Sequence, residues 1–176
     1  MRLKIDNTTL LAYILPYLNS ITTESGAVLR EAGRRTYAPS GDWWQLTTGE
    51  FLSLSTGDLT PITQGVAQEQ MTVWQYYALI DFKEWAKEFA ELIEKLTPPQ
   101  TLEQKRICDT LPKNTIQEAL LIFNRNYFGL HNFAEAEKIP IFDVLIAKKD
   151  TYAKALFEHE WQRAQMRKYK SRQQHR

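Results

Sequence analysis

One stretch decides the fold: TVWQYYALIDFKEWAKEFAELIEKL, residues 72–96. Its apolar side chains recur at steps of three and four residues, which places them on one stripe of an α-helix. The stripe consists of Phe82, Trp85, Phe89, Leu92, Ile93 and Leu96. Charged residues fill most of the remaining positions, and Pro98-Pro99 ends the pattern. We therefore predict a long amphipathic helix from about Thr72 to Leu96.

Capping signals predict where the helices begin. Thr72 and Gln75 form a capping box, in which each residue accepts a hydrogen bond from the backbone N–H of the other. Thr47 and Glu50 have the same spacing. Weaker versions are Thr101 with Gln104, Asn114 with Gln117, and Asn132 with Glu135. Each cap contributes about 1 kcal/mol, so together they favour defined helix starts.

A second long helix is expected from Pro140, a residue favoured in the first helical turn, towards Tyr169. Its broad apolar face should be buried and comprises Phe142, Leu145, Ile146, Tyr152, Ala153, Leu156 and Phe157. Shorter helices are expected near Leu102–Asp109, Thr115–Phe128 and Phe133–Lys138. The fold class is therefore all-α, a helical bundle with two long amphipathic helices.

The N-terminal part is less regular. Leu3 and Ile5 alternate with polar residues, as in a short strand, and Pro16 must kink or divide the leucine-rich helix around it. The stretch 60–70, with Pro61 and Gly65, has the composition of a linker. We predict an N-terminal portion (1–66) that is helical or mixed α+β, a helical bundle (67–162) and a basic C-terminal tail (163–176).

Composition excludes several classes of protein. Of the 176 residues, 43% are hydrophobic and 24% charged, which is typical of a globular domain. A lone cysteine, Cys108, rules out an internal disulfide and a cysteine-based zinc site and favours a reducing cytoplasm. The uncharged stretch from Asn7 to Thr23 is short, polar and broken by Pro16, so no membrane span is expected.

Charge is distributed unevenly. Residues 1–160 carry 16 bases and 21 acids, whereas the residues after Glu160 carry six bases and no acid. Helical spacing would let this tail follow phosphates, and the candidate phosphate contacts are Arg163, Arg167, Lys168, Lys170 and Arg172. A nucleic-acid-associated protein is therefore an alternative function. A terminal tail exposed to solvent, with no ligand, is the other interpretation of these basic residues.

Motifs for catalysis are missing from the sequence. The scattered glycines form no phosphate-binding loop, and no serine occupies a GxSxG elbow. His159-Glu160-Trp-Gln-Arg163 resembles HExxH, but Arg163 replaces the second zinc ligand. We therefore predict no catalytic residue, metal ligand or cofactor. An enzyme stays open only if His131 or His159 meets a carboxylate in a deep polar pocket.

Aromatic residues make up 12% of the chain, and several are adjacent. Neighbouring residues on a helix point about 100° apart, so one member of a pair can be buried while the other lines a groove. Burial of both members between the layers of a bundle is the alternative. The candidate partner-binding residues are Trp43, Trp44, Tyr76, Tyr77 and Trp85.

Three segments carry a resemblance to a known group of proteins: TTGEFLSLSTGD (47–58), YFGLHNFAEAE (127–137) and DVLIAKKD (143–150). Together with the size and helical character, they resemble small bacteriophage morphogenesis proteins, particularly tail assembly chaperones. The resemblance implies a helical, non-enzymatic protein of the host cytoplasm that coats the tape-measure protein until tail-tube subunits replace it. It also fits a structural protein of the phage neck or tail, which would reside in the virion.

The sequence thus predicts a non-catalytic protein-binding module of phage tail or virion assembly. It would shield or dock an amphipathic partner segment in an apolar groove rimmed by charge. The partner is another protein, such as a phage tail component, or a second copy of the chain.

Overall fold

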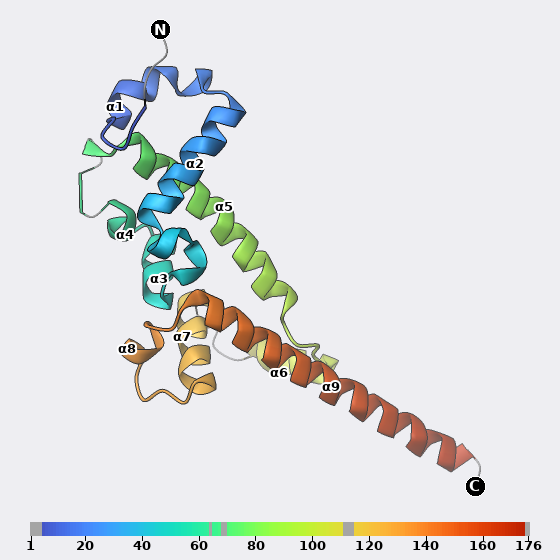
Figure 1. Cartoon of the computed structure of the whole chain (residues 1–176). Coiled ribbons are helices and arrows are strands. Elements are labelled where there is room, and N and C mark those ends of the chain that lie inside the picture. The colour runs from blue at the N-terminus through green and yellow to red at the C-terminus, as the bar shows by residue number, and fades with distance from the viewer. Residues whose placement is uncertain (1–4, 64, 68–69, 111–114, 175–176) are drawn as a thin grey trace.

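The computed structural model describes residues 5–63, 65–67, 70–110 and 115–174, most of which are helical. The elements in chain order are α1 (Leu11–Ile14), η1 (Leu15–Ser20), α2 (Thr23–Tyr37), η2 (Pro39–Gly41), η3 (Trp43–Gln45), α3 (Thr48–Thr56), α4 (Thr60–Thr63), α5 (Val73–Lys95), α6 (Leu102–Thr110), α7 (Ile116–Tyr127), α8 (Phe133–Ala136) and α9 (Ile141–Gln174). Helices α5 and α9 are the two long ones (Figure 1). The all-α prediction is confirmed.

No strand forms within the described residues, which contain only two isolated β-bridges. These bridges join Leu10 to Thr72 and Thr47 to Pro140. The strand expected at Leu3 and Ile5 is not seen: Ile5 lies in no regular element, and Leu3 falls outside the described residues. Pro16 does divide the first helix, because α1 ends at Ile14 and the 3₁₀ helix η1 continues from Leu15.

The capping boxes define the starts of α3 and α5 as predicted. The Thr47 side chain accepts from the Glu50 N–H while Glu50 accepts from the Thr47 N–H, and Thr72 and Gln75 pair in the same way. At α7 the prediction was wrong by one position, because Thr115 pairs with Glu118. Asn114, the expected cap, falls outside the described residues.

Helix α2 had no counterpart among our expectations. It crosses α5 in Figure 1 and packs closely against it. At the crossing, a Cβ on Gly33 would lie 2.6 Å from the Trp74 carbonyl oxygen and 2.8 Å from the Ala78 nitrogen. Only glycine lets the two backbones approach this closely. Gly26 and Gly33 weaken the helical signal of α2, although Thr22 caps its start by accepting a hydrogen bond from the Ser25 N–H.

The main core lies between η3, α3, α5 and the first turns of α9. Its buried side chains include Trp43, Phe51, Phe82, Phe89 and Val144. A smaller cluster joins α1 and α2 to the start of α5 through Ile14, Leu29, Val73 and Tyr77. The core therefore crosses the boundary predicted near residue 66, since residues on both sides of it pack together.

Backbone hydrogen bonds fix the start of α9 against the start of α3. The Ile141 N–H donates to the Leu46 carbonyl, and the Thr48 N–H donates to the Ile139 carbonyl, each at 2.8 Å. Thr48 is fully buried, and its hydroxyl donates to the same Ile139 oxygen. Asn124 of α7 completes this junction, because its Nδ2 donates to Thr48 Oγ1 at 2.9 Å and to the Ala136 carbonyl at 3.2 Å.

We expect Asn124→Ala to lower the free energy of unfolding by about 1–3 kcal/mol, because the buried carbonyl of Ala136 would lose a partner. Chemical denaturation measures the change. Asn126→Ala on the exposed side of the same helix is the matched control and should change stability by less than about 0.5 kcal/mol. Equal effects of the two substitutions would show that the junction contributes nothing.

The outer part of α9 differs from the prediction. Ile141, Val144 and Leu145 are buried, but several residues of the expected buried face are exposed. These are Phe142, Ile146, Ala153, Leu156 and Phe157. The helix also continues to Gln174, so the predicted tail is the end of α9 and projects past the other helices (Figure 1).

Candidate partner-binding groove

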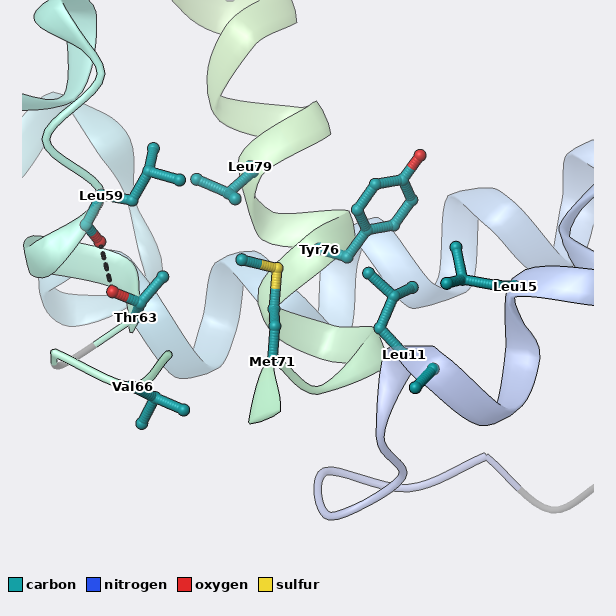
Figure 2. A pocket seen from close by; sticks show the side chains of 9 residues that line it. Leu11, Leu15, Leu59, Thr63, Val66, Met71, Tyr76 and Leu79 are labelled. Carbon is teal, nitrogen blue, oxygen red and sulfur yellow. Dashed lines mark hydrogen bonds between the residues drawn. The ribbon is translucent and has the colours of Figure 1, made fainter. Parts of the chain in front are cut away.

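An open apolar recess of about 690 Å³ lies where α1, α4 and the start of α5 meet (Figure 2). We refer to it as the apolar groove. Its lining residues are Leu11, Ala12, Leu15, Leu59, Thr63, Val66, Met71, Tyr76 and Leu79. Leu15 is 56% exposed and Val66 37% exposed, so two aliphatic side chains of the lining are open to solvent.

Local hydrogen bonds hold the two sides of the groove together. The Leu11 N–H donates to the Met71 carbonyl, and the Val73 N–H donates to the Thr9 carbonyl, each at 2.8 Å. These bonds attach the start of α1 to the start of α5. Leu11 and Leu15 are one turn apart, so both face the groove beside Met71 and Tyr76 in Figure 2.

The chemistry of the groove is nearly all aliphatic. The Thr63 hydroxyl donates to the Leu59 carbonyl at 3.0 Å, which satisfies this polar group within α4 (Figure 2). A charged group placed among these walls would lose hydration and gain no counter-charge. Met71 lines the groove from the core side, because its side chain is only 5% exposed and packs in the main core. The groove can therefore bind apolar side chains and has little means of catalysing a reaction.

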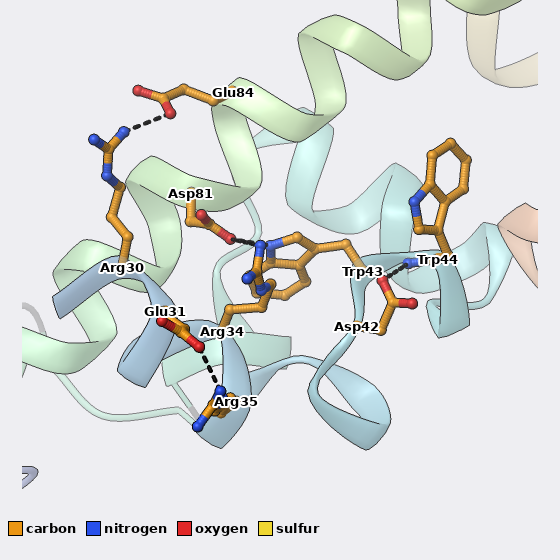
Figure 3. A network of polar contacts seen from close by, with 9 residues as sticks. All are labelled: Arg30, Glu31, Arg34, Arg35, Asp42, Trp43, Trp44, Asp81 and Glu84. Atoms are coloured by element: carbon orange, nitrogen blue, oxygen red, sulfur yellow. Dashed lines mark hydrogen bonds and ion pairs between the residues drawn. The ribbon is translucent and has the colours of Figure 1, made fainter. Parts of the chain in front are cut away.

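The predicted partner-binding residues lie mostly in the core. Trp43 is 1% exposed, its ring contacts Phe82 edge-on at 5.5 Å, and its Nε1 donates to Asp81 Oδ2 at 2.8 Å (Figure 3). Tyr77 is also buried, between α2 and α5. Neither side chain is open to a partner, because the packing of α2 and η3 on α5 covers both. Burial of Tyr77 beside Tyr76 is the division between core and groove that was expected of adjacent aromatics.

Trp44 and Trp85 are half-buried and contact each other edge-on, with ring centroids 5.1 Å apart. Trp44 also lies 6.4 Å from the Phe142 ring of α9. Figure 3 shows Trp43 and Trp44 pointing in different directions from η3. Because η3 lies between α5 and α9, both side chains meet other helices: Trp43 is buried and Trp44 is half-buried. Tyr76 is the predicted residue that lines the groove.

Ion pairs strengthen the seam between α2 and α5. Arg30 pairs with Glu84 at 2.5 Å, and Arg34 lies 3.7 Å from the Asp81 carboxylate that Trp43 also contacts (Figure 3). This seam forms the side of α5 away from the groove residue Tyr76, and it holds the Trp43 ring in place. The polar network is therefore structural.

A second recess, of about 350 Å³, lies between α6 and α9 and contains Cys108, Glu158 and His159. This recess is the candidate active site, because it contains His159 near a carboxylate. The Cys108 thiol accepts from Gln100 Nε2 at 3.8 Å, and His159 Nδ1 lies 3.5 Å from Glu160 Oε1. These contacts do not pair the thiol with the imidazole, and the recess is open. His131, the other candidate, is exposed.

The residues predicted to contact phosphate lie along the exposed end of α9. Arg163 pairs with Glu160 at 3.1 Å, while Arg167, Lys168 and Lys170 are exposed. The side chain of Arg172 falls outside the described residues. The arrangement gives a row of positive charge on a projecting helix.

In the described parts of the chain, no group of three or more His, Cys, Asp or Glu side chains is placed to hold a metal ion. None of the helices described there has the length and apolarity needed to cross a bilayer.

Comparison with known proteins gives no relative: no family model, curated protein or solved structure matches the chain. The groove and the exposed surface of α9 are therefore interpreted from their own chemistry.

Proposed function

We propose that the protein is a non-catalytic helical binding module that docks the apolar face of an amphipathic partner helix in the apolar groove. The observation that carries the proposal is the groove itself, an open recess of about 690 Å³ with aliphatic walls. Exposed apolar surface of this kind is uncommon on monomeric proteins unless it binds something. Leu15 and Val66 are the lining residues whose apolar side chains are most open to a partner.

The chemistry of the lining selects the partner. Because Thr63 is already satisfied within α4, the walls offer few hydrogen-bond donors or acceptors to an extended backbone. A helix satisfies its own backbone and presents side chains at i, i+3, i+4 and i+7, which suits an aliphatic groove. A partner helix with leucine-like anchors on one face and a charged opposite face is therefore the best fit.

We place this module in phage tail or virion assembly. The support for that setting is the resemblance of residues 47–58, 127–137 and 143–150 to phage morphogenesis proteins. A chaperone that shields helices of a longer protein would need an apolar groove open to solvent, and the groove on α1, α4 and α5 meets that requirement. A virion protein that docks a neighbouring subunit would use the same surface.

The groove can be tested with a synthetic amphipathic helix of about 18 residues, roughly 27 Å long, titrated calorimetrically against the full chain. We expect Leu15→Asp to weaken binding by about tenfold or more, because it places a charge where the apolar face docks. Leu102→Asp is the matched control, since Leu102 is an exposed leucine on α6, outside the groove. A scrambled peptide of the same composition controls for general stickiness. Equal loss in both variants, or equal binding of the scrambled peptide, would contradict the proposal.

A further inference from the structure

Helix α9 carries an exposed apolar stripe that faces away from the core. Phe157 is 72% exposed and Trp161 56% exposed, and their rings stack with centroids 6.5 Å apart. At 100° per residue, Ile146, Ala153 and Ala164 fall on the same face. Asp143 and Asp150 also fall on it, and Asp150 accepts a hydrogen bond from the Tyr127 hydroxyl of α7 at 2.7 Å. The buried residues Ile141, Val144 and Leu145 lie on the opposite face, against the core. We call the exposed set the α9 stripe.

The outer half of α9 has little else to stabilise it. Every residue from 160 to 170 is exposed, and Gln162 lines the recess between α6 and α9, so this segment buries little surface against the rest of the chain. Isolated helices shorter than about 12–15 residues are marginal in water, and most helix stability in proteins comes from packing an apolar face. A partner on the α9 stripe would supply that packing.

We infer that the α9 stripe pairs with the α9 stripe of a second copy of this chain, in the antiparallel direction. The first argument is charge. All six charged residues after Glu160 are basic, while residues 1–160 have 16 bases and 21 acids. Antiparallel pairing that crosses at Phe157 lays residues 163–172 of each copy along residues 142–151 of the other, a stretch with two acids and two bases. Parallel pairing would set the two basic ends side by side, where they repel.

The second argument is shape. In an isologous pair that crosses at Phe157, residue 161 of one copy lies opposite residue 153 of the other, and both contacts occur by symmetry. Trp161 then meets Ala153, a bulky side chain against a small one, as close packing requires. The same register places Lys154 opposite Glu160. In a parallel pair Trp161 would meet Trp161, with no small residue to receive it.

The length of α9 is sufficient for such an interface. Its 34 residues span about 51 Å. Stable interfaces use about 20–30 residues a side. Phe142, at the edge of the stripe, is half-exposed beside Trp44 and would extend the contact towards the core.

The oligomeric state of the full chain tests the inference. Sedimentation at increasing concentration should show a monomer–dimer equilibrium, and Phe157→Glu with Trp161→Glu should weaken dimerisation at least 100-fold. Met166→Glu is the matched control, because Met166 is exposed on the face of α9 opposite to the stripe and should leave the dimer intact. The substituted residues are exposed, so circular dichroism should show a folded protein in each case. A monomer at every concentration would overturn the inference. So would a dimer whose affinity is the same with the two glutamate substitutions at Phe157 and Trp161 as without them.

Direction is tested separately by a spin-label distance in dimers of Lys170→Cys, in a Cys108→Ser background that removes the native thiol. An antiparallel pair crossing at Phe157 separates the two labelled positions by about 39 Å along the helices. A parallel pair would bring them within about 10–15 Å, the spacing of neighbouring helices plus the labels, and would overturn the antiparallel arrangement. Leu15→Asp should leave dimerisation unchanged, so failure of the groove and failure of the α9 pair give different results.

Discussion

Trp43→Ala should lower the free energy of unfolding by about 3–5 kcal/mol, the range found when a large buried aromatic is truncated. Trp43 is the bulky side chain at the centre of the main core, only 1% exposed. Its loss leaves a cavity beside Phe82 and removes the indole donor from Asp81. Urea denaturation followed by far-UV circular dichroism measures the change without depending on tryptophan fluorescence.

The graded control for this prediction is Trp43→Phe. Phenylalanine keeps an aromatic ring against Phe82 and loses the hydrogen bond to Asp81, so the expected loss is smaller, about 1–3 kcal/mol. If Trp43→Ala costs no more than an average surface substitution, about 0.5 kcal/mol, Trp43 is not buried as the structure places it. That result would reopen Trp43 as a partner-binding residue.

Gly33→Ala should destabilise the protein by about 1–3 kcal/mol, although alanine is ordinarily the better helix former. The added Cβ would lie 2.6 Å from the Trp74 oxygen and 2.8 Å from the Ala78 nitrogen. These are backbone atoms of α5, so relief of the clash requires the two helices to move apart. The tightest packing between α2 and α5 would be lost.

Gly26→Ala is the matched control, because Gly26 lies in the same helix and its added Cβ meets only Tyr77, at 3.8 Å. That substitution should raise the free energy of unfolding by as much as about 1 kcal/mol. Opposite signs for the two substitutions are the expected result of thermal or chemical denaturation. Two stabilising substitutions would show that α2 does not cross α5 at Gly33.

Much of the fold follows from local sequence signals. The capping boxes at Thr47 and Thr72 locate α3 and α5, since a cap needs only residues three positions apart. Pro16 divides the first helix for the equally local reason that its ring fixes φ. Helix α2 is different, because Gly33 is explained only by the backbone of α5, which lies more than 40 positions away in the sequence.

The site was harder to predict because it, too, depends on contacts between helices that are far apart in the sequence. Adjacent aromatics were expected to divide between core and surface, as Tyr77 and Tyr76 do, with Tyr76 in the groove. Trp43 and Trp44 do not divide in this way, because η3 lies between two helices. The residues that remain open, Leu15 in the groove and Phe157 on α9, carry no signal that distinguishes them from core positions. Only the arrangement of the helices decides which apolar faces are covered.

The claim that the apolar groove binds an amphipathic helix can be tested most directly by methyl NMR of methionine. The chain has three methionines, and Met71 lines the groove while Met166 lies on the outer half of α9. On titration with the synthetic amphipathic helix, the Met71 methyl signal should shift until it saturates, and the Met166 signal should stay in place. A Met71 signal that does not move, or one that the scrambled peptide moves equally, would contradict the assignment of the groove as the binding site.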